Sequence, residues 1–439
     1  MVSRSRRPRW RHARRNARHS GPRALLTAGA GVLAFLLGGA AYAYIDIQNN
    51  ITSIDVNALV SSASTPSETT TPTPDPTYDD PNAGRALNIL VMGSDERTGE
   101  NGELGGVDDQ TVGMRSDTTL LVHVSADRTR IEAVSIPRDL KIPIPSCPLP
   151  DGSSTSSYAD AMFNSAIAQG SQQSETGSDE AKQFGVACTV LTVQAMTGIT
   201  VDEYVLVDFA GFKNMVDAIG GVDVCLAEPL WDNYTGLDLP AGAQKLDGQQ
   251  ALQLARARHN IGDGGDIGRI DRQQQLLSVM LAEVMEKNLL TNASELYRFL
   301  SAATQSLTTS PGLAQIPSLV GLATSMRGIS MDAVDFVTIP VTEHRNDRNR
   351  LQLADNADEV WAALAMDQPL STVLPELASA AENAGETETA DSTATADTTA
   401  VAGTATPESG GATDATTAET TAPEPTEDAT PPRLISRTC

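Results

Sequence analysis

The chain contains 439 residues, of which 56 are acidic and 31 are lysine or arginine, so its formal net charge at pH 7 is −25. A chain of this length can hold two or three average domains, but its low-complexity ends indicate a single folded unit between them. The acidic excess argues against nucleic acid as a partner.

The N-terminal segment predicts a membrane anchor. Residues 1–23 contain nine arginines and no acidic residue, and residues 24–45 follow without any charge. As a helix, residues 24–45 span roughly 33 Å, which matches the hydrocarbon core of a bilayer. Because basic flanks stay inside, we expect a single-pass cell-membrane protein with a cytoplasmic N-terminus and an extracellular domain. A cleaved signal peptide is the alternative, since the small residues of 40–43 resemble a cleavage site.

Two low-complexity segments flank the expected domain. Residues 46–85 include a Ser/Thr/Pro-rich spacer, and residues 371–439 form an Ala/Thr/acidic tail with few large apolar residues. The folded unit should therefore span residues 86–370. Since all the acidic residues follow the arginine-rich segment, the exported part carries a net charge near −34.

Hydrophobic patterns within 86–370 predict a mixture of strands and helices. Asp247 and Gln250 have the spacing of a capping box at the start of one helix. Helices intermixed with a largely buried sheet are typical of the α/β class, here an α-β-α layered sandwich around a central mixed sheet. The expected strands are 87–92, 118–124, 131–136, 203–208, 222–226 and 333–339, and the expected helices are 180–197, 209–219, 248–258, 269–288, 293–307, 314–325 and 355–365.

Charged residues gather at the ends of the first three strands. Asp95 follows the first strand, Arg115 and Asp117 open the second, and Arg138 and Asp139 follow the third. If neighbouring strands run antiparallel, these residues meet at one sheet edge. Carboxylates beside arginines suit Mg²⁺ or Mn²⁺ together with the oxygens of a diphosphate. A solvated rim of salt bridges is the alternative interpretation.

A second basic cluster lies in "ARARHNIGDGGDIGRIDRQQQ", residues 255–275. Arg269, Arg272 and Gln273 have the i, i+3, i+4 spacing that places them on one helix face. That face is in the first helical turn, where backbone N–H groups also favour an anion. The stretch lacks the dinucleotide and P-loop patterns. It also contains Arg256, Arg258 and Asp266.

Four cysteines follow the predicted span. An oxidising extracellular location permits disulfides, and Cys147–Cys188 is the favoured pair. Cys225 also lies in the expected domain and Cys439 ends the chain, so the pairing stays open.

Six motifs occur in an order that resembles the LytR-CpsA-Psr family of cell-wall glycopolymer ligases. They are "NILVMGSDER", "RSDTTLLVHV", "SIPRDL", "DEYVLVDFAGFKNMVDAIGGVDV", "LDGQQALQLARARH" and "GDIGRIDRQQQ". The cysteine segments "IPSCPLP", "VACTVLTV" and "VDVCLAEP" resemble the actinobacterial branch. The resemblance implies transfer of a glycan phosphate from a polyprenyl diphosphate carrier to peptidoglycan, with the prenyl chain enclosed between sheet and helices. It does not name the polymer, although arabinogalactan is one candidate.

The resemblance also implies roles for individual residues. Asp95 and Asp117 resemble the metal-binding carboxylates, and Ala257 departs from the larger residue that many members carry. Candidates for catalysis are Arg115, Arg138, Asp139 and Asp266. The residues that resemble the diphosphate-contacting set, or stand in its motifs, are Arg115, Arg138, Arg256, Arg258, Arg269, Arg272 and Gln273.

Two other functions use the same features. A diphosphatase would need the same metal and arginines, with water in place of the acceptor hydroxyl. A non-catalytic factor that binds or assembles wall polymer belongs to another class, and the presence of all the charged site residues argues against it.

Overall fold

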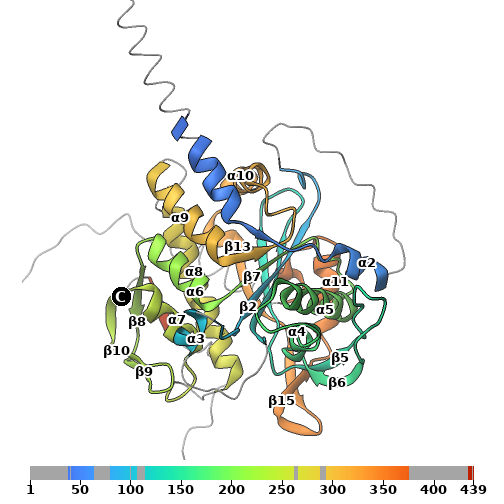
Figure 1. Ribbon diagram of the computed structural model, residues 1–439. Coiled ribbons are helices and arrows are strands. Elements are labelled where there is room, and N and C mark those ends of the chain that lie inside the picture. The colour runs from blue at the N-terminus through green and yellow to red at the C-terminus, as the bar shows by residue number, and fades with distance from the viewer. Residues whose placement is uncertain are drawn as a thin grey trace, which may run out of the picture.

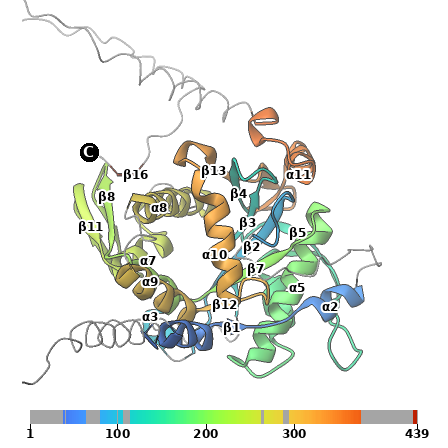
Figure 2. The ribbon, with the colours of Figure 1, turned by 90° about the horizontal axis from the view of Figure 1, so that it is seen from above.

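A computed structural model of the protein places a seven-stranded mixed sheet at its centre, with helices on both faces (Figures 1 and 2). The residues that the structure describes are 38–39, 41–63, 80–98, 100–105, 114–261, 265–286, 293–374, 434–437 and 439. This arrangement confirms the expected α/β sandwich.

The central sheet has the strand order β1-β12-β7-β2-β3-β4-β13. The strands β2, β3 and β4 form an antiparallel meander, while β7 runs parallel to β2 and β13 runs parallel to β4. The predicted antiparallel pairing of the first three strands is therefore confirmed. Their bounds are β1 Thr52–Ser53, β2 Leu87–Ser94, β3 Ser116–Val124, β4 Ile131–Ser135, β7 Glu203–Val207, β12 Leu307–Thr309 and β13 Val334–Thr338.

One face of the sheet carries the main core. Leu90, Met92 and Leu121 are fully buried there and pack with Val186 of α5 and Trp361 of α11. A Ser178 cap starts α5, because its side chain accepts a hydrogen bond from the N–H of Ala181. The helices on this side are α2 Asn57–Ala63, α4 Ser165–Ser171, α5 Asp179–Thr197 and α11 Ala357–Ala365.

The opposite side holds a second lobe with its own core. Val216, Leu254 and Leu276 belong to one buried apolar cluster, so α6, α7 and α8 pack as a unit. The expected capping box of Asp247 and Gln250 begins α7. Helices on this side are α3 Glu100–Gly105, α6 Phe209–Ala218, α7 Gly248–Arg256, α8 Asp266–Glu286, α9 Ala293–Ser306 and α10 Ile316–Ser325.

Small sheets and short turns complete the structure. The sheet β11-β8-β16 and the hairpin β9-β10 belong to the second lobe, whereas β5-β6 and β14-β15 extend the main domain. Their bounds are β5 Lys141–Ile144, β6 Tyr158–Met162, β8 Val222–Leu226, β9 Leu230–Asp232, β10 Leu237–Leu239, β11 Gly242–Leu246, β14 Val341–His344, β15 Asp347–Leu353 and β16 Ile435–Ser436. The 3₁₀ turns are Met326–Gly328, Met331–Ala333 and Leu370–Thr372.

Two expected boundaries need correction. Residues 51–63, assigned to the spacer, dock onto the domain, because Ile54, Val56 and Leu59 are buried in the main core. At the other end, Leu374 is also buried in that core. The chain then returns at Ile435, which is buried in the second lobe, so the last residues are part of the fold and not of the tail.

Most of the predicted span 24–45 lies outside the described residues. Residues 41–50 are helical, and Tyr42 and Ile45 are exposed. Among the helices of the described part, none combines the length and hydropathy that a bilayer crossing requires.

All four cysteines form disulfides. Cys147 is joined to Cys188, the favoured pair, and Cys225 of β8 is joined to Cys439 at the end of the chain. The second bond was not foreseen. It anchors β16 against β8 and closes a loop with a sequence separation of 214 residues.

Removal of the Cys225–Cys439 bond tests this anchoring. Cys439→Ser should lower the free energy of unfolding by about 2–4 kcal/mol, because the unfolded chain regains the freedom that the closed loop removes. Urea denaturation monitored by circular dichroism measures the change. The Cys225→Ser, Cys439→Ser double variant should lower the free energy of unfolding no more than either single variant does, since each breaks the same bond. Unchanged stability in all three would show that the bond does not anchor the lobe.

Candidate active site

The site begins where β2 ends and β3 starts. The N–H of Asp95 donates to the carbonyl of Arg115 (3.0 Å), and the N–H of Arg115 donates to Oδ1 of Asp95 (2.7 Å). This reciprocal pair closes the sheet edge and buries Asp95, which is 8% exposed. The Arg115 side chain instead is exposed, and no hydrogen bond or ion pair joins it to another described residue.

Arg138 lies at the centre of the site. Its Nη1 donates to Oδ1 of Asp117 (2.9 Å), and its Nε donates to Oδ1 of Asp266 (3.0 Å). Asp139 is a longer contact at 3.8 Å. The guanidinium is thus held between a residue of β3 and the first residue of α8. Since 17% of the side chain stays exposed, Arg138 remains accessible to a ligand.

The first turn of α8 adds a second guanidinium, which is buried. Nη2 of Arg269 contacts Oδ1 of Asp266 (2.6 Å) and donates to the carbonyl of Asp117 (3.1 Å). The Arg269 side chain is 2% exposed, and burial lowers its pKa to about 10. Its Nε and the Oδ2 of Asp266 are buried without a hydrogen-bond partner. A cation at a helix N-terminus opposes the helix dipole, so Asp266 is needed to hold it there.

Arg256 and Arg258, at the end of α7, differ in what they contact. Arg258 approaches Asp117 at 3.7 Å, and 30% of its side chain is exposed. Burial and the neighbouring Arg138 lower its pKa. Arg256 donates to the carbonyls of Leu104 and Gly105 (2.7 Å each). It also lies over the Phe209 ring at 4.4 Å, so it fastens α3 to the second lobe.

Arg272 and Gln273 hydrogen-bond to the backbone at the end of α7 and do not line the open part of the site. Arg272 is buried and donates to the carbonyl of Ala257 (2.6 Å). Gln273 donates to the carbonyl of Ala255 (2.8 Å) and accepts from Thr118 (3.2 Å). Both side chains therefore fix the connection between α7 and α8. Ala257, where many family members carry a larger residue, is fully buried between these contacts.

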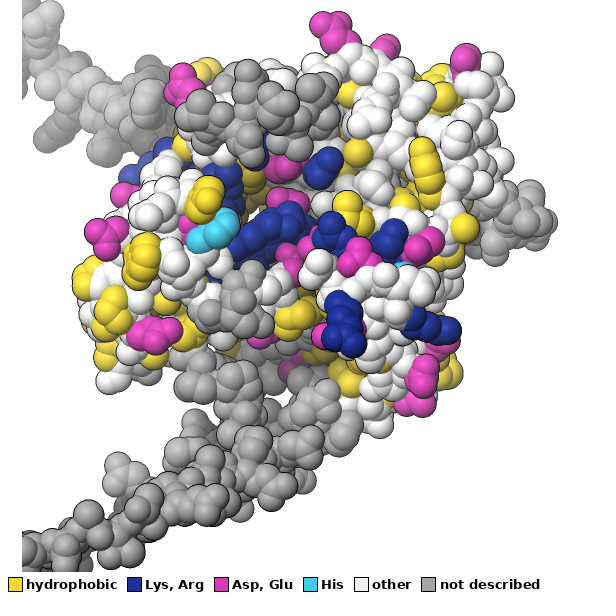
Figure 3. Space-filling view, turned by 90° about the horizontal axis from the view of Figure 1, so that it is seen from below, with side chains coloured by type: hydrophobic (Ala, Val, Ile, Leu, Met, Phe, Trp, Pro, Cys, Tyr) yellow, Lys and Arg dark blue, Asp and Glu magenta, His cyan; other side chains and the backbone are white. Residues whose placement is uncertain are grey.

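One ion pair escaped sequence analysis. Asp139 contacts Arg350 of β15 at 3.0 Å, so the hairpin β14-β15 reaches the site from far along the chain. Arg350 lies in no motif of the first three strands, and only the fold reveals the contact. Figure 3 shows the result, a hollow in this face where Lys/Arg and Asp/Glu side chains gather.

The pKa values of the Asp95 and Asp117 carboxyls shift in opposite directions. Burial, together with the charge of Asp117, raises the pKa of Asp95 from 3.8 to about 6. Burial also acts on Asp117, but Arg138, Arg269 and Arg258 outweigh it and lower the pKa of that carboxyl. Two neighbouring carboxylates that repel one another form a site that a divalent cation would stabilise. Within the described part of the chain, no group of three His, Cys, Asp or Glu residues could hold a metal.

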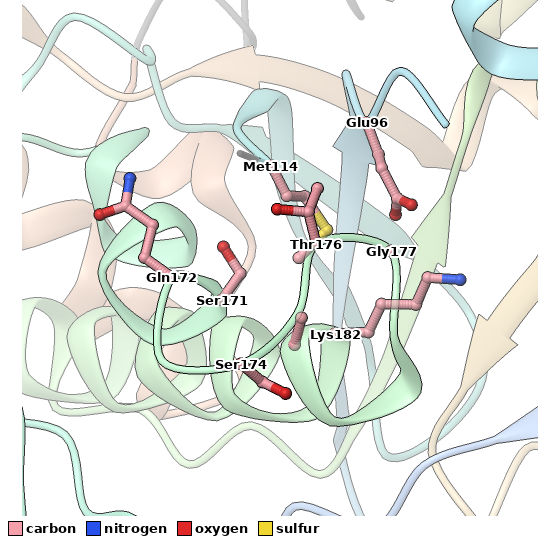
Figure 4. A pocket seen from close by; sticks show the side chains of 9 residues that line it. Glu96, Met114, Ser171, Gln172, Ser174, Thr176, Gly177 and Lys182 are labelled. Carbon is pink, nitrogen blue, oxygen red and sulfur yellow. The ribbon is translucent and has the colours of Figure 1, made fainter. Parts of the chain in front are cut away.

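A cavity of about 260 Å³ with polar and apolar lining lies between the end of β2 and the α4–α5 connection. Glu96 reaches it from the end of β2, and Lys182 reaches it from α5. In Figure 4 the carboxylate of Glu96 points toward Gly177 of the α4–α5 connection. Hydroxyl groups from the same connection complete the lining, which consists of Glu96, Met114, Ser171, Gln172, Ser174, Thr176, Gly177, Ala181 and Lys182.

The sheet face toward α10 is apolar but incompletely covered. Ile89, Val122 and Val205 are only partly buried there, although they lie on central strands. On the other face of the same strands, Leu90 and Leu121 are fully buried. Leu87 and Val124 of the same cluster are fully buried, so this face of the sheet is covered in part and leaves some apolar surface accessible.

Sequence comparisons identify the same family that the six motifs resemble. The model of the LytR_cpsA_psr family matches residues 46–366. The cell wall biosynthesis protein LcpA of Corynebacterium glutamicum is 32% identical over 270 residues, which cover 59% of this chain and 51% of LcpA. The polyisoprenyl-teichoic acid–peptidoglycan teichoic acid transferase TagU of Oceanobacillus iheyensis is 30% identical over 211 residues, 48% of this chain and 55% of TagU.

The chain therefore spans about half the length of the curated relatives it matches. Among solved structures, the LytR-Csp2A-Psr enzyme from Actinomyces oris is 21% identical with a TM-score of 0.46, covering 65% of this chain and 91% of that one.

The raised pKa of Asp95 predicts a stabilising substitution. Because the folded pKa of about 6 exceeds the ordinary 3.8, the favourable effect of the protonated carboxyl is complete below pH 3.8 and is lost as the pH rises through 6. Without added metal, Asp95→Asn should therefore raise the free energy of unfolding by about 2–3 kcal/mol at pH 7 and by little at pH 4. Urea titrations at both pH values measure this. A variant less stable than the wild type at pH 7 would contradict it.

Proposed function

Because the chain belongs to the LytR-CpsA-Psr family, we propose that it is a phosphotransferase of the cell wall. In this proposal it joins a glycan, carried on a polyprenyl diphosphate, to peptidoglycan through a phosphodiester bond. The names of its relatives support this choice, since TagU is named for transfer of teichoic acid to peptidoglycan. The polymer itself is left open, because LcpA is named only for cell wall biosynthesis.

The arrangement of Arg138, Arg258 and Arg269 carries the proposal. All three guanidiniums lie around Asp117 and Asp266, and the first two stay partly exposed. A guanidinium has five N–H donors, so a side chain that uses two for carboxylates keeps others for phosphate oxygens. Phosphoryl transfer needs mainly positioning and charge stabilisation, and preorganised arginines supply both.

The proposed reaction is a displacement at phosphorus. An acceptor hydroxyl attacks the phosphorus that carries the glycan, and the bond to the bridging oxygen breaks. The products are the glycan–phosphate–acceptor diester, polyprenyl phosphate and the proton of the hydroxyl. The cavity lined by Glu96, the residue after Asp95, offers room for an acceptor group, which a diphosphatase does not require.

Asp95 and Asp117 fit a divalent metal ion. Mg²⁺ is often held by one or two carboxylates together with substrate phosphates, so two neighbouring carboxylates are sufficient ligands. Burial and the charge of Asp117 raise the pKa of Asp95, and such a cation would stabilise the charged form of this carboxyl against both. When bound, Mg²⁺ or Mn²⁺ neutralises part of the charge of the diphosphate.

The apolar sheet face suits the prenyl chain of the carrier. Ile89, Val122 and Val205 lie on the strands β2, β3 and β7, and the charged end of β2 carries Asp95. A lipid that lies along this face therefore has its diphosphate at the arginines. The apolar prenyl chain then contacts apolar side chains, and the charged diphosphate contacts arginines.

We also propose a membrane anchor at residues 24–45, with a cytoplasmic N-terminus and an extracellular domain. Tyr42 and Tyr44 are exposed at the end of this segment, as is typical of aromatic residues at a bilayer surface. The disulfides Cys147–Cys188 and Cys225–Cys439 support an oxidising location.

Substitutions at the centre of the site test the transfer reaction. With the full chain in detergent, a short-chain polyprenyl-diphosphate oligosaccharide and uncrosslinked peptidoglycan strands, Arg138→Ala and Asp117→Ala should each reduce joined product at least 100-fold. Both remove charge stabilisation from the transition state. Lys213→Ala, a change at a partly exposed lysine of α6, is the control and should keep activity. Release of polyprenyl phosphate without joined product would indicate a diphosphatase, and binding without reaction would indicate a carrier-binding factor.

Metal removal tests the ligand assignment. Dialysis against a chelator should abolish transfer, and either Mg²⁺ or Mn²⁺ should restore it. The metal should also raise the melting temperature of the wild type but not of Asp95→Asn, because that variant lacks a charged ligand. Full activity in excess chelator, with no metal effect on melting, would refute the site.

A further inference from the structure

We propose that Tyr234 and His259 form a stacking platform for the first sugar of the carrier-linked glycan, the sugar bonded to the diphosphate. This inference rests on the proposed function and assigns a subsite to its donor substrate. The two residues follow β9 and α7, respectively, and come together at the edge of the second lobe.

A buried carboxylate organises the platform. The Asp232 side chain is 0% exposed, and its Oδ1 accepts from the N–H of Tyr234 (2.8 Å). Its Oδ2 accepts from the N–H groups of Arg258 (2.7 Å) and His259 (2.9 Å). One side chain therefore fixes the backbone on both sides of the platform and next to a site arginine. Burying a charge in this way is costly unless it is fully hydrogen-bonded, as it is here.

The platform itself faces solvent. The Tyr234 and His259 rings stack with centroids 4.0 Å apart and an interplanar angle of 30°. Even so, Tyr234 is 78% exposed and the His259 side chain is 52% exposed. Because one ring face of Tyr234 is covered by His259, this exposure leaves the other face open. An exposed, rigidly held aromatic ring adds little to the core and is typical of a binding surface.

The position next to Arg258 points to a sugar on the donor. Arg258 precedes His259, shares the Asp232 carboxylate with it, and contacts Asp117 at 3.7 Å. In a carrier-linked glycan the first sugar is bonded directly to the phosphate, so it lies next to the arginine that binds this phosphate. The C–H face of a sugar ring can then pack on the open face of Tyr234. Figure 3 shows a histidine and hydrophobic side chains at the rim of the charged hollow.

The acceptor is expected elsewhere. The cavity lined by Glu96 and Lys182 lies on the side of the main core and α5. The platform belongs to the second lobe, beyond Arg258. The two glycans therefore approach the phosphate from different lobes, and the platform acts on the donor.

Two probes separate this subsite from the diphosphate site. The affinity of the full chain in detergent is measured by calorimetry for farnesyl diphosphate and for farnesyl-diphospho-N-acetylglucosamine. Tyr234→Ala should lower the affinity for the sugar-bearing probe about tenfold and the affinity for the sugar-free probe less than twofold. Tyr234→Phe should keep both affinities because it retains the ring. Arg138→Ala should weaken the binding of both probes. Tyr158→Ala, which removes a half-exposed tyrosine ring from β6, should change the affinity for neither.

Several results would overturn the platform. An equal loss of affinity for both probes in Tyr234→Ala would mean that the ring only supports Arg258. An unchanged affinity for both probes would mean that the ring does not contact the glycan. A higher KM for peptidoglycan strands with unchanged donor affinity would place the acceptor there instead. If the wild type binds neither probe, the proposed function fails and the platform with it. If it binds both, the assignment of the diphosphate site stands whatever Tyr234→Ala does, and the transfer assay alone decides the reaction.

Discussion

The site depends on the placement of Arg138 between Asp117 and Asp266. Charges that leave water are tolerated only when partners replace the lost hydration, and removing one partner of such a pair typically costs about 3–5 kcal/mol. The antiparallel register of β2, β3 and β4 sets Asp117 beside Arg138. Asp266, the first residue of α8, contacts Arg138 from the other side, so this guanidinium joins a strand of the central sheet to a helix of the second lobe.

The second lobe supplies most of the basic charge and is itself held by the end of the chain. The core of Val216, Leu254 and Leu276 keeps α6, α7 and α8 together. Ile435 adds to that core, and its N–H donates to Oε1 of Gln275 in α8 (2.9 Å). The C-terminal disulfide thus acts on the same helix whose first turn carries Arg269. Stability of the lobe and geometry of the site are coupled through α8.

Local patterns predicted the elements well and long-range contacts poorly. The apolar runs and the capping box located the central strands and α7, because these signals lie within one segment of sequence. The same patterns placed Asp95 and Arg138 at one sheet edge. Arg350 and Asp232 were missed, since their roles arise from contacts that no short motif encodes. The Cys225–Cys439 bond was missed for a related reason, because the acidic stretch before Cys439 hides a terminal strand that returns to the fold.

The central claim is that the arginine cluster binds the diphosphate of a lipid carrier. A crystal structure of the full chain with a short prenyl diphosphate and Mg²⁺ tests it most directly. We expect phosphate oxygens within hydrogen-bond distance of the guanidiniums of Arg138 and Arg258, with the prenyl chain along Ile89 and Val205. A diphosphate bound away from Arg138, or a prenyl chain on the outer surface, would show that the arginine cluster does not bind the carrier.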